Sequence, residues 1–225
     1  MIEVILDTET TGLSITQKHR VVEIGCIELN NQIPTGKFFH QYLNPQRSVS
    51  EDAYKVHGYS NEFLADKKIF EEIVENFLNF IKNKKLIIHN ASFDLSFLNY
   101  ELRLIKKKEI DSKNIVDTLE IARQKYPGSQ NSLDALCKRF NIDNLKREKH
   151  SALVDCELLK EVYINLLDQK EQKLNLEHVE NINVSFKKNY NEKNINIRKI
   201  INPSNEELSL HEKYLKSHLP KNFYS

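Results

Sequence analysis

Cysteine is scarce in this 225-residue sequence, which holds only three, and these lie far apart. They are Cys26, Cys137 and Cys156, an odd number without a C-x-x-C pair. This pattern argues against a disulfide framework and against a thiolate zinc site. We therefore expect all three thiols to be reduced.

Long apolar stretches are also missing. No apolar run approaches the length that a bilayer requires. The N-terminus lacks a basic segment followed by an apolar stretch and a small-residue cleavage site. From these two absences we expect a cytoplasmic protein that makes no membrane contact.

The chain also has no excess of charge of either sign. It contains 33 Lys and Arg residues and 32 Asp and Glu residues, for a formal net charge of +1. A protein that grips nucleic acid through a broad basic surface must neutralise many phosphates. Any polyanionic substrate must therefore be held by a local site or by a partner.

The order of apolar patterns predicts one domain over residues 1–170. Strands are predicted at 2–6, 21–29, 38–43 and 85–89, where apolar residues run continuously or alternate. Helices are predicted at 60–82, at 92–102 with Ser92 as N-cap, at 117–126, at 132–140 with Ser132 or Asn131 as N-cap, and at 151–167. Strands followed by helices and further short strands are typical of an α/β or mixed α+β sheet covered by helices.

The character of the chain changes after residue 170. Residues 171–202 are rich in Asn and Lys and lack periodicity, which predicts a flexible linker, although codon bias in an AT-rich genome would produce the same composition. Residues 203–225 regain helical spacing, with Ser204 as N-cap and Leu208 and Leu215 on one face. A short amphipathic helix on a tether usually docks onto a partner.

Three separated segments carry acids where apolar residues would be expected. Asp7 and Glu9 end a buried-looking strand in VILDTETTGL and point to the same face, because side chains alternate along a strand. Asp94 lies on the buried side of its helix, and Asp155 borders the apolar stripe of the last long helix. His150 precedes that helix, on a loop from which it could reach the same site.

Each of these features has a structural explanation by itself: a strand that ends in solvent, a first-turn acid favoured by the helix dipole, and a structural histidine. Together, however, four carboxylates and a histidine suit the hydrolysis of a phosphodiester. Carboxylates select hard cations, magnesium or manganese rather than zinc. A pair of such ions can activate a water and stabilise the leaving oxygen, and a histidine can accept the proton.

The segments D-x-E, H-N-A-x-F-D and H-x-A-x-x-D resemble, in order and spacing, the three motifs of the DEDD exonuclease superfamily. The histidine five residues before the last aspartate is typical of its histidine subtype. Further segments, among them VVEIGCIEL, VHGYSNEFL, NSLDALCKRFNIDN and the tail PSNEELSLHEKYLK, are similar to the epsilon (DnaQ) family of proofreading subunits of bacterial DNA polymerase III. This resemblance covers nearly the whole chain.

The resemblance implies a ribonuclease-H-like α/β fold, with a mixed sheet flanked by helices and a flexible C-terminal tail. It implies a 3′–5′ exonuclease that proofreads DNA synthesis and releases 5′-mononucleotides. Asp7, Glu9, Asp94 and Asp155 would bind two Mg²⁺ or Mn²⁺ ions, and His150 would be the general base.

The resemblance also implies contacts with the 3′-terminal nucleotide. Besides Asp7, Glu9 and Asp155, these are Thr10, Thr11, Gly12, Asp52, His57 and Phe93. For the last three, a solvated loop acid, a loop histidine and a core aromatic residue are equally good explanations.

The partners implied are the 3′ end of DNA, the alpha subunit of DNA polymerase III through the tail, and a small theta-like subunit. Contact with the sliding clamp is not expected, because QKEQKLNL places Gln169 and Gln172 at the wrong offsets and lacks an aromatic end.

Three other functions compete with this interpretation. RNA exonucleases of the same superfamily use the same catalytic residues, but stand-alone RNases usually lack such a tail. A phosphatase with an aspartate nucleophile would share the apolar run into the first acid, but here the second acid is Glu9. A scaffold that had lost the chemistry would not be expected to retain all five candidate residues.

Overall fold

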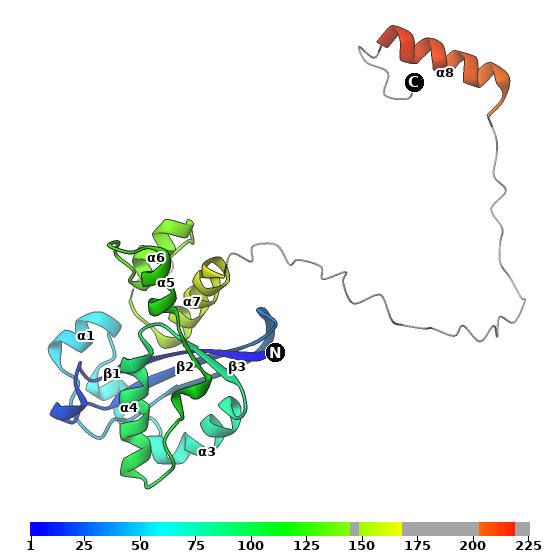
Figure 1. The fold of residues 1–225 in the computed structure, drawn as a ribbon. Coiled ribbons are helices and arrows are strands. Elements are labelled where there is room, and N and C mark those ends of the chain that lie inside the picture. The colour runs from blue at the N-terminus through cyan, green and yellow to red at the C-terminus, as the bar shows by residue number, and fades with distance from the viewer. Residues whose placement is uncertain (145–148, 168–202, 219–225) are drawn as a thin grey trace, which may run out of the picture. The chain divides into compact units, whose positions relative to one another are not determined.

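The computed structural model in Figure 1 describes residues 1–144, 149–167 and 203–218. The chain divides into two units, Met1–Leu174 and Asn175–Ser225, and each is described by itself. The predicted linker over 171–202 lies outside the described residues, as do Gln169 and Gln172. No helix within the described ranges combines the length and the apolar character needed to cross a membrane.

The first unit contains a five-stranded mixed sheet of strand order β3-β2-β1-β4-β5. The first three strands form an antiparallel meander, whereas β4 and β5 run parallel to β1. The central strand is therefore β1, which is paired on both sides. The strands are β1 (Ile2–Thr10), β2 (Val21–Asn30), β3 (Ile33–Tyr42), β4 (Lys85–Ile88) and β5 (Ile115–Asp117).

Helices cover both faces of this sheet (Figure 1). Val4 and Leu6 of β1 pack with α3 and α4 on one face, whereas Ile5 packs with α7 on the other. The helices α5 and α6 pack against the outer side of α7. The helices of this unit are α1 (Glu51–His57), α2 (Asn61–Ala65), α3 (Phe70–Ile81), α4 (Ala91–Leu104), α5 (Thr118–Lys125), α6 (Leu133–Phe140) and α7 (Ala152–Leu166), with 3-10 turns at Ile15–Gln17 and Ser112–Asn114.

The element pattern confirms the predicted α/β architecture and corrects several details. The helix predicted over 60–82 is divided into α2 and α3, and α1 and β5 were not predicted. Ser132 caps α6 as predicted, because its Oγ accepts a hydrogen bond from the N–H of Ala135 at 3.3 Å.

The prediction that Ser92 caps α4 is wrong. The N-cap is Asn90, in the left-handed region at φ 66°, and its side chain makes no capping hydrogen bond. Instead, the Asp117 carboxylate accepts hydrogen bonds from the N–H groups of Asn90 and Ala91 at 3.0 and 2.9 Å. The acceptor for this helix start is therefore supplied by a distant strand end, which no local pattern indicates.

In the second unit, α8 spans Asn205–His218 where a tail helix was predicted. Ser204 and Glu207 form a capping box: Ser204 Oγ accepts from the Glu207 N–H at 3.3 Å, and Glu207 Oε2 accepts from the Ser204 N–H at 2.8 Å. Leu208, Leu210 and Tyr214 are exposed.

Candidate active site

The candidate site is built on the last turns of the central strand. Asp7 and Glu9 share the α7 face of β1 with Ile5, because alternate side chains of a strand point to the same face. Glu9 is largely buried and Asp7 is partly exposed. Removal from water, and then the charges of Asp94, Asp155 and Glu9, raise the pKa of Asp7 well above its usual value.

The second acid of the site comes from the first turn of α4. Asp94 is only 3% exposed, and its Oδ1 accepts hydrogen bonds from the N–H and the Oγ1–H of Thr8, at 3.0 and 2.7 Å. Burial raises the pKa of Asp94 to about 7, although the hydrogen bonds with Thr8 act in the opposite direction. Thr8 points to the α4 face of β1 and therefore ties Asp94 to the central strand.

The third contribution comes from α7 and the loop before it. Asp155 is buried in the first turn of α7, and its Oδ2 lies 3.3 Å from Nδ1 of His150. The His150 side chain remains 42% exposed, so that solvent can reach it. One ligand atom each from Glu9, His150 and Asp155 lie within 4.8 Å of one another.

The helix α7 can carry these residues to the strand because it packs unusually close to the sheet. A Cβ atom at Gly25 of β2 would lie 2.5 Å from the carbonyl carbon of Ala152, so that no larger residue fits there without displacing the helix backbone. One turn later, the Cys156 thiol donates a hydrogen bond to the Gly25 carbonyl at 3.2 Å. Small residues on both elements thus bring Asp155 next to Asp7.

The segment after Glu9 forms a tightly hydrogen-bonded loop. Thr10 Oγ1 donates to the carbonyl of Gly12 at 2.7 Å, and Thr11 Oγ1 is 2.9 Å from Nδ1 of His19. A Cβ atom at Gly12 would lie 2.4 Å from the His19 ring. These residues directly follow Glu9, and both threonine hydroxyls are engaged within the loop; their predicted contact with the terminal nucleotide stays a prediction.

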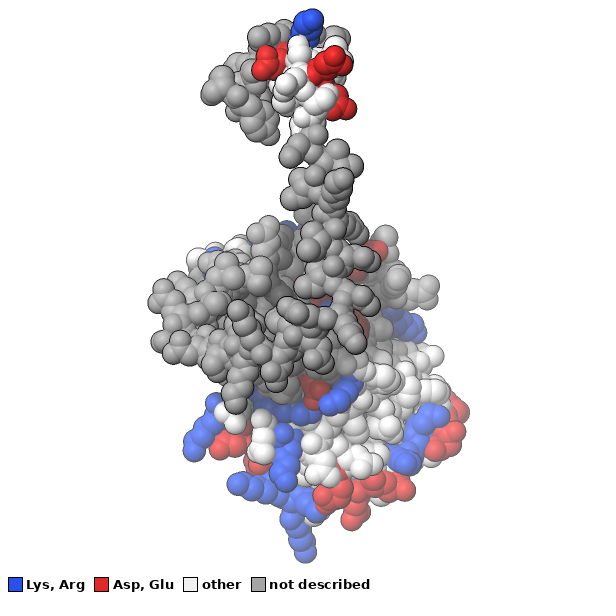
Figure 2. Space-filling model, turned by 90° about the vertical axis from the view of Figure 1, so that its right-hand side faces the viewer, with Lys and Arg blue, Asp and Glu red and all other residues white. Residues whose placement is uncertain are grey.

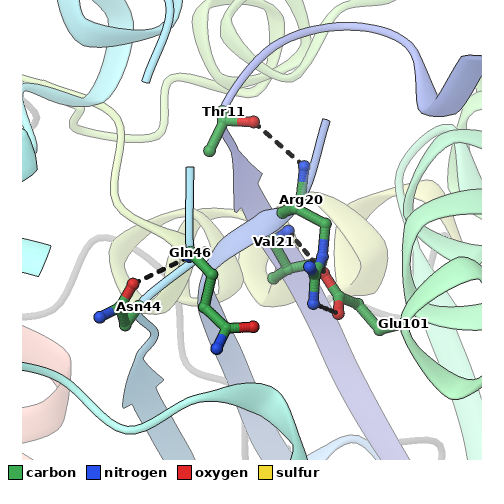
Figure 3. Close-up of polar contacts among 6 residues, drawn as sticks. All are labelled: Thr11, Arg20, Val21, Asn44, Gln46 and Glu101. Carbon is green, nitrogen blue, oxygen red and sulfur yellow. Dashed lines mark hydrogen bonds and ion pairs between the residues drawn. The ribbon is translucent and has the colours of Figure 1, made fainter. Parts of the chain in front are cut away.

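A neighbouring ion pair fixes the other end of this loop (Figure 3). Thr11 Oγ1 accepts from the Arg20 N–H at 3.0 Å, and Arg20 forms a bidentate pair with Glu101 of α4 at 2.7 and 2.6 Å. Glu101 also accepts from the Val21 N–H at 3.2 Å. The loop is thereby fastened to the same helix that carries Asp94.

The three remaining candidates differ in their positions. His57 ends α1 and is 3% exposed, its Nδ1 accepts a hydrogen bond from the Tyr59 N–H, and burial lowers its pKa. Phe93 lies one residue before Asp94, half-buried beside Phe97. Asp52 points away: its side chain is 95% exposed and pairs with Lys55.

Sequence reasoning did not identify Thr8, Asp117 or Glu23. Glu23 is fully buried in β2 and accepts four hydrogen bonds. Burial by itself would raise the pKa of Glu23, but these hydrogen bonds outweigh burial and hold that pKa below its usual value. A glutamate inside the apolar run VVEIGCIEL was the signal that could have drawn attention to it.

The donor set suits a hard divalent cation. Asp7 and Asp94 form no ion pair with any Lys or Arg side chain of the described ranges, and both have raised pKa values. Carboxylate oxygens contributed by β1, α4 and α7 are the ligands that such cations prefer. A bound cation would supply the missing positive charge.

A mixed five-stranded sheet with a carboxylate cluster at the end of its central strand is the arrangement of the ribonuclease-H-like fold, and the family match places the chain among the exonucleases of that fold. The model of the Exonuclease (RNase T) family matches residues 4–163. Exonucleases of this family generally use divalent metal ions. Among solved structures, the nuclease domain of 3′hExo, a DEDDh family member bound to rAMP, covers 75% of this chain and 92% of its own with a TM-score of 0.66 and 19% identity. Exonuclease X in complex with 5′ overhanging duplex DNA covers the same shares with a TM-score of 0.59 and 24% identity.

A curated relative from Rickettsia felis, DNA polymerase III subunit epsilon, is 48% identical over 220 residues and matches 96% of each chain. A second, of the same name and from Buchnera aphidicola, is 46% identical over 221 residues. The chain therefore belongs to the epsilon family of exonuclease subunits.

Proposed function

We propose that this exonuclease removes the 3′-terminal nucleotide of DNA as the proofreading subunit of a DNA polymerase III. The observation that carries the proposal is the convergence of acids from β1, α4 and α7 beside His150, which is partly exposed. Solved structures of the same fold are described with either DNA or rAMP, so the fold leaves the substrate open. The similarity to subunits of a DNA polymerase favours DNA.

Asp7, Glu9, Asp94 and Asp155 are the proposed ligands of two Mg²⁺ or Mn²⁺ ions. When bound, the ions supply positive charge beside the scissile phosphodiester, where negative charge develops in the transition state. Thr8 orients the Asp94 carboxylate for this task through its two hydrogen bonds.

His150 is the proposed general base. Asp155 Oδ2 lies 3.3 Å from Nδ1 of His150 and would orient the imidazole, so that the other ring nitrogen can accept a proton from the attacking water. The water attacks the last phosphorus atom, the 3′ oxygen of the preceding nucleotide leaves, and a 5′-mononucleotide is released.

The terminal nucleotide is proposed to lie against Thr10, Thr11, Gly12, His57 and Phe93. Thr10, Thr11 and Gly12 directly follow Glu9 in the sequence, and Phe93 directly precedes Asp94, so that a nucleotide held at the carboxylates would lie near them. Stacking on an aromatic ring such as that of Phe93 tolerates any base. Asp52, whose side chain faces solvent, would reach the nucleotide only after a change of rotamer. A mismatched end would enter more often, because unpairing it costs a few kcal/mol less than unpairing a matched end.

The duplex itself would be held by the polymerase. The chain has a net charge of +1, and on the face shown in Figure 2 basic and acidic side chains are interspersed. Within the second unit, Leu208, Leu210 and Tyr214 of α8 offer exposed apolar groups for the alpha subunit. We propose residues 1–170 as the catalytic domain, 171–202 as a linker and 203–225 as the docking segment, in a cytoplasmic complex that a theta-like subunit would complete.

The test is a magnesium-dependent time course on 3′-matched and 3′-mismatched primer-templates and on single-stranded RNA of the same sequence, with Asp7→Ala as the blank. Faster single-nucleotide trimming of the mismatched DNA is expected. Preferential degradation of RNA would assign the chain to the RNA-processing branch of the superfamily, and metal-independent or absent cleavage would contradict the proposal.

A further inference from the structure

A buried glutamate outside the proposed ligand set connects several parts of the site. Glu23 of β2 is fully buried, and all four of its hydrogen-bond partners donate to it. Its Oε1 accepts from His40 Nε2 at 2.7 Å and from Ser151 Oγ at 3.0 Å, and its Oε2 accepts from Tyr59 OH at 2.7 Å and from the Ala152 N–H at 2.8 Å. Hydrogen bonds to an ionised acceptor are about twice as strong as neutral ones.

Two of these donors belong to the residues that directly follow His150. Ser151 is the N-cap of α7 and Ala152 its first residue, so that Glu23 ties down both the end of the loop and the start of the helix. On the other side, the His150 N–H donates to the carbonyl of Val56 in α1 at 3.2 Å. The backbone of His150 is therefore held between α1 and the buried carboxylate.

A third donor connects Glu23 to the second histidine near the site. The Tyr59 N–H donates to His57 Nδ1 at 3.0 Å, and the two rings stack with centroids 4.7 Å apart. The hydroxyl of the same tyrosine donates to Glu23. The Glu23 carboxylate therefore accepts hydrogen bonds both from the segment that follows His57 and from the segment that follows His150.

We propose that Glu23 is a positioning residue of the exonuclease reaction. It fixes the backbone around His150 so that the imidazole stays beside Asp155. This inference rests on the proposed function, because it assumes that His150 accepts the proton. The change Glu23→Gln removes the negative charge that all four donors share, and its NH₂ group would require two of the four partners to accept a hydrogen bond instead of donating one.

The loss of activity expected for Glu23→Gln can be estimated from its role as a positioning residue. Replacing a group that orients a residue in direct contact with the reaction typically lowers activity by about 10- to 100-fold. We expect Glu23→Gln to lower kcat by this factor. Ser151→Ala removes only one of the four hydrogen bonds, and we expect a smaller loss of kcat with an unchanged KM.

The control is Glu28→Gln, on the same strand. Glu28 is 4% exposed and binds Lys84 and Thr35 at the opposite end of β2, so that this variant loses a glutamate charge of the same strand that has no contact with the described residues of the His150 loop. Far-UV circular dichroism and thermal unfolding of each variant would show that it is folded. We expect kcat of Glu28→Gln to stay within about twofold of the wild type, as for a change that leaves the reacting geometry intact.

The deciding experiment is a double-mutant cycle in full-length protein, with single-turnover cleavage of single-stranded DNA in Mg²⁺. If Glu23 acts through His150, then Glu23→Gln costs about 10- to 100-fold in the wild type but almost nothing in a His150→Ala background. The same loss in both backgrounds, or no loss in either, would overturn the inference. Should Glu23→Gln not fold, Ser151→Ala enters the same cycle: its smaller loss of activity should disappear in the His150→Ala background, and an equal loss in both backgrounds, or none in either, would overturn the inference.

The two proposals can fail separately. Wild-type protein that leaves DNA uncleaved, or His150→Ala protein that cleaves it at the wild-type rate, would refute the proposed function. If wild-type protein is active and His150→Ala is impaired, a fast Glu23→Gln variant would refute only the role of Glu23.

Discussion

In the metal-free protein, raising the pH from about 6 to about 8 is expected to lower the free energy of unfolding, because an acid with a raised pKa in the folded state resists ionisation there. Burial raises the pKa of Asp94 to about 7, against about 3.9 in an unfolded chain. Above about pH 4, Asp94 is ionised in the unfolded chain but still protonated in the folded one. The free energy of unfolding therefore falls as the pH rises, and it stops falling once Asp94 is also ionised in the folded protein, above about pH 7. Between about pH 6 and pH 8, Asp94 alone accounts for about 1 kcal/mol.

The raised pKa of Asp7 acts in the same direction, so that the observed change should be at least as large. A divalent cation bound to these carboxylates favours their ionised form and should abolish the loss. The assay is urea unfolding followed by circular dichroism at several pH values, with EDTA or with Mg²⁺. Circular dichroism is the appropriate probe because the chain contains no tryptophan.

The matched variant is Asp94→Asn, in which the amide oxygen can still accept both hydrogen bonds from Thr8. It should reduce the pH dependence in EDTA to the part that Asp7 contributes, and it should gain little stability from Mg²⁺. Two results would refute the reasoning. The free energy of unfolding in EDTA could rise from about pH 6 to about pH 8, or it could change with pH equally steeply in the wild type and in Asp94→Asn.

Three further outcomes are expected. Asp7→Ala and Asp155→Ala should each abolish DNA cleavage while leaving the apo protein at least as stable, since fewer like charges remain crowded together; retained activity in a nuclease assay would exclude their assignment. Gly25→Ala should cost about 1–3 kcal/mol in urea unfolding and reduce activity, because its Cβ would lie 2.5 Å from the Ala152 backbone; an unchanged midpoint would show that α7 can shift freely. Deleting residues 175–225 should preserve cleavage of single strands but abolish co-purification with the polymerase alpha subunit, and a truncated protein that still co-purified would place the docking surface elsewhere.

Much of the site could be predicted because its parts are local. The alternation of side chains along β1 places Asp7 and Glu9 on one face whatever surrounds the strand. The N-caps at Ser132 and Ser204 depend only on residues three positions away, and both side chains accept the expected hydrogen bond. The position of His150 before α7 follows in the same way from the start of a helical pattern.

Features that depend on distant segments could not be predicted in this way. Asp117 replaces Ser92 as the partner of the α4 N-terminus across 26 residues of sequence, and Asp52 points to solvent although it precedes the buried His57 on the same short helix. A helix end accepts any carboxylate that the fold brings near it, so that local preference does not determine which one is used.

Glu23 is the clearest case, because it contacts Ser151 across 128 residues. By itself the sequence determined most of the strands and helices and which acids lie at their ends, since these properties depend on neighbours a few residues away. Only the tertiary structure decided that the acids meet, that Gly25 lets α7 approach, and that a buried glutamate holds the His150 loop. Such contacts form when elements pack, and packing depends on the shapes of surfaces that are distant in the sequence.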